Sequence, residues 1–316
     1  MNITELSKNL MLVDLSIGKW SNNRQDKVGS ETLKREYGIK DHENKNRIRA
    51  YKSAINPKNL KGIDRLCNDF RTYFYTVTAP FGNNGPRVLN ADYFPIFRAK
   101  TREFCQSFDT EVTNIIDNFE TWKSESKTEL NGAYNEADYP GAHEVQGKYQ
   151  RKVNFLPFPI SDHLQATGLS DIELQEIKTD IENKVKANLE NATKDCFDRI
   201  EKTIKHLIEK CGQTRENKSG EITAGIFRDS LIENIKELTE LIPFLNITKN
   251  PDIERARNEM VKKFNDLKPE DLRDDPLLRQ STIAAAEDFL KDLFPATTDA
   301  ATTDAATTDE NLDWLK

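Results

Sequence analysis

The amino-acid sequence predicts a mainly α-helical protein with a small β element, an α+β chain in which a long-helix bundle accompanies a short N-terminal strand and hairpin sheet. Segments 95–130 and 169–211 carry apolar residues at steps of three and four, the spacing of a helix with one buried face. Segment 12–17 alternates apolar and polar residues, as a half-buried strand does. These patterns divide the chain into residues 1–168, a helix bundle at 169–294 that packs on the first part, and a disordered tail at 295–316.

The first part starts with a short amphipathic stretch and a strand. The strand places its apolar side chains on one face, namely Val13, Leu15 and Ile17. Residues 22–62 are rich in Asn, Lys and Arg and lack apolar periodicity. We therefore expect loops there, with a short helix near 33–37.

A helix at 63–74 and a hairpin follow. The cluster from Gly82 to Gly85 has turn chemistry and separates the apolar runs 74–81 and 88–94. The hairpin is therefore expected to turn at these glycines.

The first long helix has an unusually aromatic stripe, made of Phe97, Phe104, Phe108, Val112, Ile115, Phe119 and Trp122. Residues 131–152 contain Pro140, Gly141 and Gly147 and are expected to form a loop. Residues 153–160 are expected to form a short extended piece, limited by two prolines.

The second long helix has clear start and stop signals. Ser170 with Glu173 has the spacing of a capping box, and Gly212 follows the last apolar position. The mean apolar step exceeds 3.6 residues, which argues against a strict left-handed heptad coil. Partner helices are expected at 222–242, 251–267 and 276–294. Because both long stripes are continuous, we expect the two long helices to pack in one core.

The tail repeats Ala-Thr-Thr-Asp from residues 296, 301 and 306 and ends with Leu312, Trp314 and Leu315. The repeat has no continuous apolar face, which predicts a tether. Apolar residues at the end of an acidic tether are typical of a short motif that binds a groove on a protein partner. The alternative is that this tip folds back on the chain's own helices.

The composition excludes some functional classes. The 316 residues are 36% hydrophobic, and 46 Lys and Arg against 53 Asp and Glu give a net charge of −7, so the chain as a whole is not a nucleic-acid-coating polycation. No apolar run approaches the roughly 18 residues of a membrane span, and the first ten residues lack the apolar region of an export signal. We expect a cytoplasmic protein with no membrane contact.

Catalytic motifs are not found in the sequence. It lacks the glycine-rich nucleotide loops, HExxH and GxSxG. Acid and histidine neighbours occur at Asp41-His42-Glu43 and at His143-Glu144, and they would make a metal site only if folding joined them. The sequence thus predicts no catalytic residues, no cofactor and no metal site, with a cryptic metal-dependent enzyme as the remaining alternative.

The spacing of the four cysteines indicates that they have a structural role. Cys67, Cys105, Cys196 and Cys211 are far apart, form no CxxC and lie among apolar residues at helical spacing. We expect reduced, buried thiols, although Cys196, Cys211 and His206 could also be read as a metal cluster.

A basic segment runs from Lys19 to Lys61. It contains twelve Lys or Arg and five Asp or Glu, a local net charge of about +7, with Trp20, Tyr37 and Tyr51 interleaved. This composition suits phosphate contacts and base stacking. The candidate nucleic-acid-binding residues are Lys19, Arg24, Arg47, Arg49 and Lys52. The alternatives are a solvated insertion or a surface that binds an acidic partner.

Several features in order resemble a known family. They are LVDLSIGKW at 12–20, Asn56-Pro57-Lys58, APFGNNGPRVL at 79–89, the aromatic helix and VNFLPFPI at 153–160. Over residues 8–290 the chain resembles the family called domain of unknown function 3150, which is borne by phages, plasmids and integrative elements. The tail repeat is outside the pattern.

The resemblance implies a non-enzymatic scaffold or adaptor of a phage or mobile element. In that family the genes often lie beside a MoxR-like AAA+ ATPase and a protein with a von Willebrand A domain. These two are the expected protein partners, the expected place is the host cytoplasm, and a homo-oligomer remains open. A nucleic-acid-binding accessory factor that uses the basic segment is the alternative function.

Overall fold

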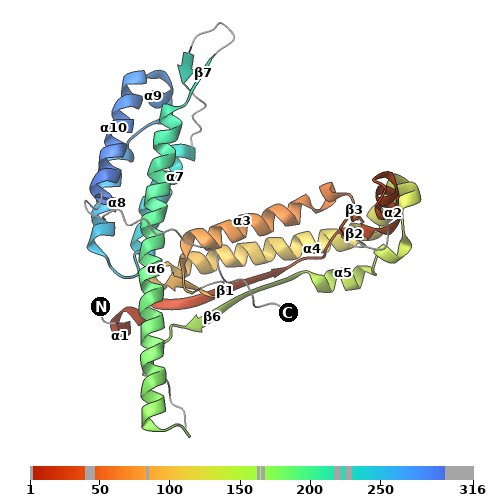
Figure 1. Cartoon of the computed structure of the whole chain (residues 1–316), viewed down its shortest axis with the longest axis horizontal. Helices are drawn as coiled ribbons and strands as arrows, with labels where there is room; N and C mark the ends of the chain where they lie inside the picture. Colours follow the sequence, from red (N-terminus) through yellow and green to blue (C-terminus); the bar gives the residue numbers. More distant parts are fainter. Residues whose placement is uncertain are drawn as a thin grey trace. The chain divides into compact units, whose positions relative to one another are not determined.

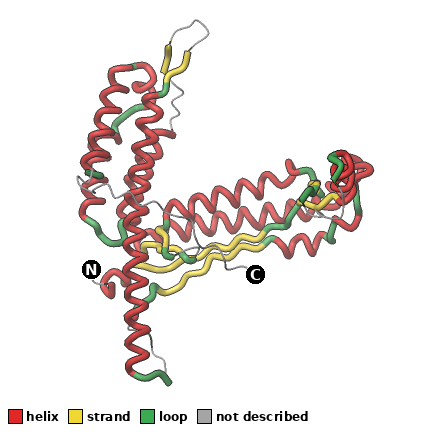
Figure 2. Tube along the Cα trace, in the orientation of Figure 1, coloured by secondary structure: helices red, strands yellow, loops and turns green. Residues whose placement is uncertain are grey.

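The structure is a computed structural model that describes residues 3–39, 47–82, 85–161, 164, 168–216, 222–224 and 230–295. It divides into two compact units, which are considered separately below. The first contains Met1–Arg199 and Thr239–Glu254, and the second contains Ile200–Leu238 and Arg255–Lys316. Helices make up most of the described chain, with short antiparallel strands, which confirms the predicted fold class (Figures 1 and 2).

A four-stranded antiparallel sheet lies at the centre of the first unit, in the order β4-β5-β1-β6. Its strands are β1 (Leu10–Gly18), β4 (Ala79–Pro80), β5 (Arg87–Asn90) and β6 (Gln150–Pro157). The pairing of β1 with β6 runs from Met11 opposite Pro157 to Gly18 opposite Gln150. The predicted strand, hairpin and extended piece are therefore confirmed as neighbours in one sheet.

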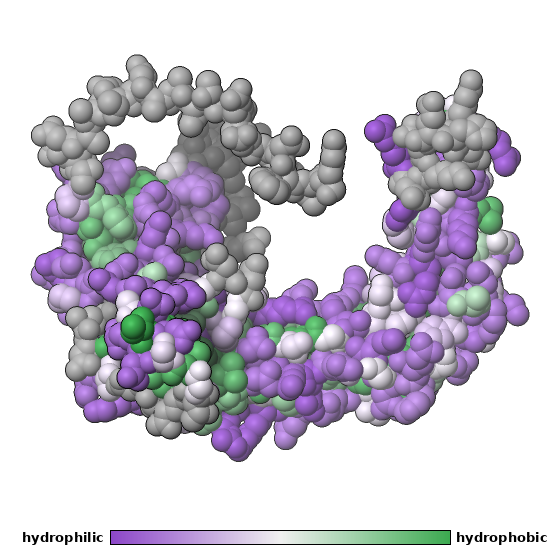
Figure 3. All heavy atoms as spheres, turned by 60° about the horizontal axis from the view of Figure 1, so that its bottom comes forward, coloured by the Kyte–Doolittle hydropathy of each residue, from purple (hydrophilic) through white to green (hydrophobic). Residues whose placement is uncertain are grey.

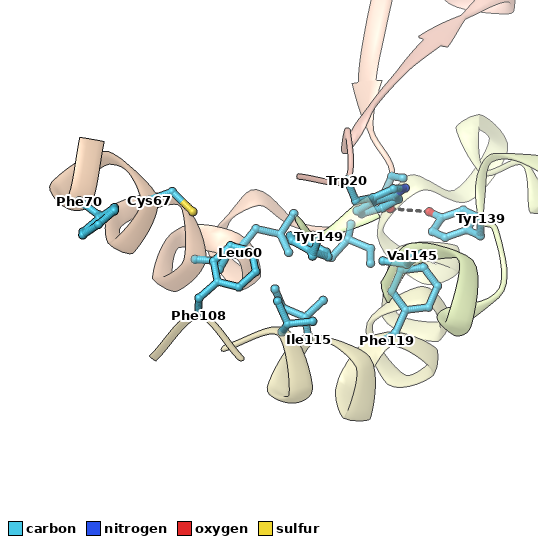
Figure 4. Packing of buried hydrophobic residues seen from close by; sticks show 14 of the residues in the cluster. Trp20, Leu60, Cys67, Phe70, Phe108, Ile115, Phe119, Tyr139, Val145 and Tyr149 are labelled. Carbon is cyan, nitrogen blue, oxygen red and sulfur yellow. Dashed lines mark hydrogen bonds between the residues drawn. The ribbon is translucent and has the colours of Figure 1, made fainter. Parts of the chain in front are cut away.

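Helices α3 (Lys61–Val77) and α4 (Phe94–Leu130) pack together on one side of this sheet. The aromatic stripe of α4 is buried, and Phe70 of α3 stacks on Phe104 of α4 with ring centroids 4.0 Å apart. At one end of the pair, Trp20, Tyr139, Val145 and Tyr149 close the core over Ile115 and Phe119 (Figure 4). This core therefore joins four segments that are far apart in the sequence, at Trp20, 54–70, 104–119 and 139–149.

The expectation that the two long helices share one core is wrong for this unit. Val13 packs with Phe97 of α4, whereas Leu12 packs with Val185 and Leu189 of α6 (Asp171–Gly212). Successive residues of a strand point to opposite faces of its sheet. The sheet therefore separates α4 from the first half of α6.

The segments expected to be loops contain regular structure. They form β2 (Asn23–Asp26), α2 (Lys27–Glu36), β3 (Ala50–Ser53) and α5 (Ala142–Lys148). The chain also has α1 (Ile3–Ser7) at its start and four short 3-10 helices, namely η1 (Pro57–Leu60), η2 (Ala91–Tyr93), η3 (Asn131–Ala133) and η4 (Glu136–Asp138), among the described residues. Asp26 caps α2 by accepting a hydrogen bond from the Gly29 amide at 3.0 Å. Single buried residues such as Val145 attach these elements to the core. A single buried residue gives no apolar periodicity in the sequence, so these elements could not be predicted from it.

The second unit contains the last part of α6, from Ile200 onward, and α7 (Ser230–Leu245) as far as Leu238. It also contains α8 (Pro251–Phe264) from Arg255 onward, α9 (Pro269–Asp274) and α10 (Pro276–Leu293). Its buried side chains include Ile200, Ile204 and Leu207, and Phe264 meets Phe289 edge to face at 6.0 Å. The helix expected at 222–242 begins only at Ser230, because Ile222–Ala224 forms β8 and pairs with β7 (Thr214–Glu216). The division between units falls inside α6, between Arg199 and Ile200.

Candidate functional site

The basic segment folds around the small sheet of β2 and β3. In its antiparallel register Arg24 lies opposite Lys52, and Gln25 lies opposite Tyr51. Alternation along the strands directs these two pairs to opposite faces. The face with Arg24 and Lys52 is the inner face, since both residues contact the loop at 133–138.

The charges of three predicted nucleic-acid-binding residues are held by the protein itself. The Lys52 ammonium lies 2.8 Å from a carboxylate oxygen of Asp138, and Lys19 forms an ion pair with Asp64. Arg24 donates from Nε to the carbonyl oxygen of Asp138 at 3.0 Å and also contacts the Ser21 and Asn23 carbonyls. These three side chains therefore hold the local fold together.

Trp20 is also part of the core and is not a surface for stacking bases. Its side chain is only 7% exposed, and it meets Phe119 edge to face at 5.7 Å. The Arg24 guanidinium covers the ring at 5.1 Å. In contrast, Tyr37 and Tyr51 are exposed.

The other two predicted residues, Arg47 and Arg49, are exposed to solvent. Neither forms an ion pair within the part of the chain that the structure describes. They precede β3 and therefore lie close in the chain to Tyr51, which is 62% exposed. The structure thus divides the five predicted residues into three that are used internally and two that are available.

A second exposed surface is the projecting end of α6, residues 169–184. No residue from 171 to 184 is buried, and the helix extends beyond the sheet of its own unit (Figure 1). Ser170 and Glu173 form the predicted capping box, with the Ser170 amide 2.8 Å from the Glu173 carboxylate and the Glu173 amide 3.3 Å from the Ser170 hydroxyl. The helix therefore has a specific start although its first turns have little tertiary support.

This end of α6 carries exposed apolar side chains. Ile172 is 73% exposed and Ile177 is 39% exposed, and Leu169 precedes them. Five acidic and two basic residues share residues 171–184, a net charge of −3. With the lower part of Figure 1 brought forward, apolar atoms appear in small groups among hydrophilic ones (Figure 3).

An arginine that the sequence analysis did not single out fixes α6 to the end of α3. Arg199 donates to the carbonyl oxygens of Tyr75, Thr76 and Thr78 at 3.0, 2.6 and 3.0 Å, and its Nε lies 2.8 Å from Asp195. These carbonyls belong to the last residues of α3 and the one after it, which lack intrahelical partners. One residue in a helix face gives no sequence signal of such a contact.

Arg87 of β5 reaches the same place. It donates to the hydroxyl and carbonyl oxygens of Thr78 at 2.7 and 2.8 Å and covers the Tyr75 ring at 5.0 Å. Burial and the neighbouring Arg199 lower the pKa of Arg87. Two guanidinium groups therefore cap the end of α3 from two different elements.

Of the candidate metal ligands, the structure describes His143, Glu144, Cys196, His206 and Cys211. Among the described residues, no group of three or more His, Cys, Asp and Glu is placed to hold a metal ion. His143 and Glu144 are exposed on α5, whereas His42 and His163 lie outside the described residues. Burial raises the pKa of Cys196 to about 12 and that of Cys211 to about 11, as expected for thiols in a core.

The tail residues Leu312, Trp314 and Leu315 also lie outside the described residues, so their predicted docking role stays a prediction. Within the described chain, no helix is long and apolar enough to cross a membrane. Comparisons with protein-family models, with curated proteins and with solved structures find no match to this chain.

Proposed function

We propose that this chain is a non-enzymatic scaffold that binds a protein partner through the projecting end of α6. The observation that carries the proposal is the exposure of Ile172 and Ile177 on a helix whose residues 171–184 are nowhere buried. Exposed apolar side chains of a helix can bind another protein by entering an apolar groove on its surface. The acidic residues around them fit a groove with a basic rim.

Anchoring of α6 within the first unit supports this proposal. Val185, Leu189 and Ala192 pack against the sheet, and Arg199 fixes the helix to the end of α3. The helix is continuous from these contacts to Asp171, and Ile181 still packs on the edge of the same cluster, so the turns before Ile181 extend from a structured base. A preorganised helix loses less conformational entropy on binding than a disordered segment does.

The sequence resemblance suggests which partner this is. An AAA+ ATPase or a von Willebrand A protein of a phage or mobile element, acting in the host cytoplasm, is our proposal for it. The tail tip at Leu312, Trp314 and Leu315 would add a second contact with the same partner. The identity of the partner is inferred from the sequence resemblance, and the second contact is inferred from the tail sequence.

The test is a pull-down from the native host with the full chain as bait, followed by affinity measurement with the recovered partner. Ile172→Asp with Ile177→Asp should weaken binding at least tenfold and leave the melting temperature unchanged. Gln175→Asp with Asn183→Asp is the matched control, since it adds the same charge to the same exposed stretch without removing apolar surface. Equal binding by both double variants would contradict the proposal.

A further inference from the structure

We propose that the outer face of the β2–β3 sheet binds single-stranded nucleic acid, with Tyr51 as a stacking platform and Arg47 and Arg49 as phosphate contacts. This is a second activity beyond the protein-binding role of α6. The geometry points to it because the fold fixes one face of the small sheet internally and leaves the other face exposed.

The inner face orients the sheet. Lys52 and Arg24 bind Asp138, and the Ser30 hydroxyl accepts a hydrogen bond from the Ala50 amide at 2.9 Å. These contacts attach β3 to the 133–138 loop and to α2. The side chains that alternate with them, Gln25 and Tyr51, must therefore face away from the protein.

The outer face combines the groups that single-stranded nucleic acids require. Tyr51 is 62% exposed, so its ring can stack on a base, a contact that every base can make. Gln25 lies directly opposite Tyr51, and Asn23 lies opposite Ser53 at the next pair on the same face. Their exposed amides can both donate to and accept from base edges. An unpaired base is needed, because a duplex does not offer its ring faces for stacking.

Charge favours the same ligand. Described residues 19–39 and 47–61 contain ten Lys or Arg and three Asp or Glu. Once the internally paired residues are set aside, Arg47 and Arg49 are exposed cations close in the chain to Tyr51, whose ring is also exposed. A polyanion with planar groups matches both features, whereas an acidic peptide matches only the charge.

The test is fluorescence anisotropy of the full chain with labelled oligo-dT and oligo-rU of about 15 nucleotides, near the upper site size of single-strand-binding folds. We expect salt-sensitive binding. Tyr51→Ala should weaken it by about five- to hundredfold, the range for one stacked base, while Tyr51→Phe should stay within about twofold. Arg47→Glu with Arg49→Glu should reduce the slope of log affinity against log salt by about 1.4, which corresponds to two phosphates.

The matched control is Lys186→Glu with Lys194→Glu. Both lysines are exposed on α6, and the variant changes the net charge by the same amount as the arginine variant. The control should bind as the unmodified chain does, with unfolding curves of all variants superimposable. The proposal is overturned if neither oligonucleotide binds at low salt, if the control loses as much affinity as the arginine variant, or if Tyr51→Ala binds normally. Displacement of the oligonucleotide by polyglutamate at equal charge concentration would instead assign the surface to an acidic protein.

Discussion

Arg24 and Lys52 lie directly opposite each other in the β2–β3 sheet, and both bind Asp138. Like charges in such a cross-strand pair repel each other. Here the Lys52 ammonium meets the Asp138 carboxylate at 2.8 Å, and Arg24 Nε meets the Asp138 carbonyl oxygen at 3.0 Å. Asp138 therefore offsets the repulsion between Arg24 and Lys52, and its contacts with both residues attach the sheet to the 133–138 loop.

Replacing Asp138 by Asn should lower the free energy of unfolding by about 1.5 to 3 kcal/mol, the usual contribution of a hydrogen bond to a charged group. The side chains of Lys52 and Asp138 are mostly buried, so the ammonium would lie opposite Arg24 with the Ala133 carbonyl as a partner but no carboxylate. Urea unfolding of Asp138→Asn, Lys52→Met and the double variant measures the coupling. Strictly additive losses would show that the two residues do not interact.

Replacement of Arg199 by Met should lower the free energy of unfolding by about 2 kcal/mol or more, because the Tyr75 and Thr76 carbonyl oxygens lose their side-chain donor and the Thr78 carbonyl keeps only that of Arg87. Arg199→Lys should recover less than half of the loss, since a single ammonium cannot reproduce the fork of a guanidinium. Denaturant titration of the three proteins is the measurement. A Lys variant as stable as the unmodified chain would contradict the assigned geometry.

The parts of the fold that could be predicted are those with a period. Apolar residues recur at helical spacing in α4 and α6 and alternate with polar ones in β1, as any half-buried helix or strand requires. The start of α6 was predicted from a local motif, the Ser170 capping box. Apolar periodicity could not show whether α4 and α6 pack in the same core. Both helices show the same stripe whichever face of the sheet they cover.

The candidate sites followed the same rule. Composition located the basic segment but could not separate Lys19, Arg24 and Lys52 from Arg47 and Arg49, because their partners Asp64 and Asp138 are distant in the sequence. Trp20 was expected on the surface for a similar reason, since its neighbour Phe119 is about a hundred positions away. Arg199 had no signal at all.

Buried thiols predict a pH dependence of stability. Burial raises the pKa of Cys196 to about 12, above the value of about 8.5 for a free thiol. The folded state therefore keeps the thiol proton to a higher pH than the unfolded state does. The contribution of this thiol to the free energy of unfolding is complete below about pH 8.5 and is lost as the pH rises toward 12. Between about pH 8 and 10, unfolding free energy should fall by about 1 to 2 kcal/mol more in the unmodified chain than in Cys196→Ala. Parallel pH profiles would contradict the burial.

Deletion of residues 296–316 should leave the melting temperature unchanged, because the Ala-Thr-Thr-Asp repeat offers no continuous apolar face to a core. The same deletion should weaken capture of the protein partner, and Trp314→Ala should reproduce most of that loss, as an aromatic anchor does. Thermal unfolding and the pull-down described above provide the two readouts. A melting temperature lowered by several degrees would mean that the tip packs on its own chain.

Amide hydrogen exchange of the chain, alone and with the recovered partner, tests the central claim most directly. In the isolated chain residues 171–184 should exchange faster than residues 185–199, since only the latter stretch contains buried side chains and the Arg199 anchor. Partner binding should slow exchange at 171–184 and leave 185–199 unchanged. Protection of 171–184 in the isolated chain, or a partner footprint confined to other segments, would contradict the proposal that this end of α6 is the docking surface.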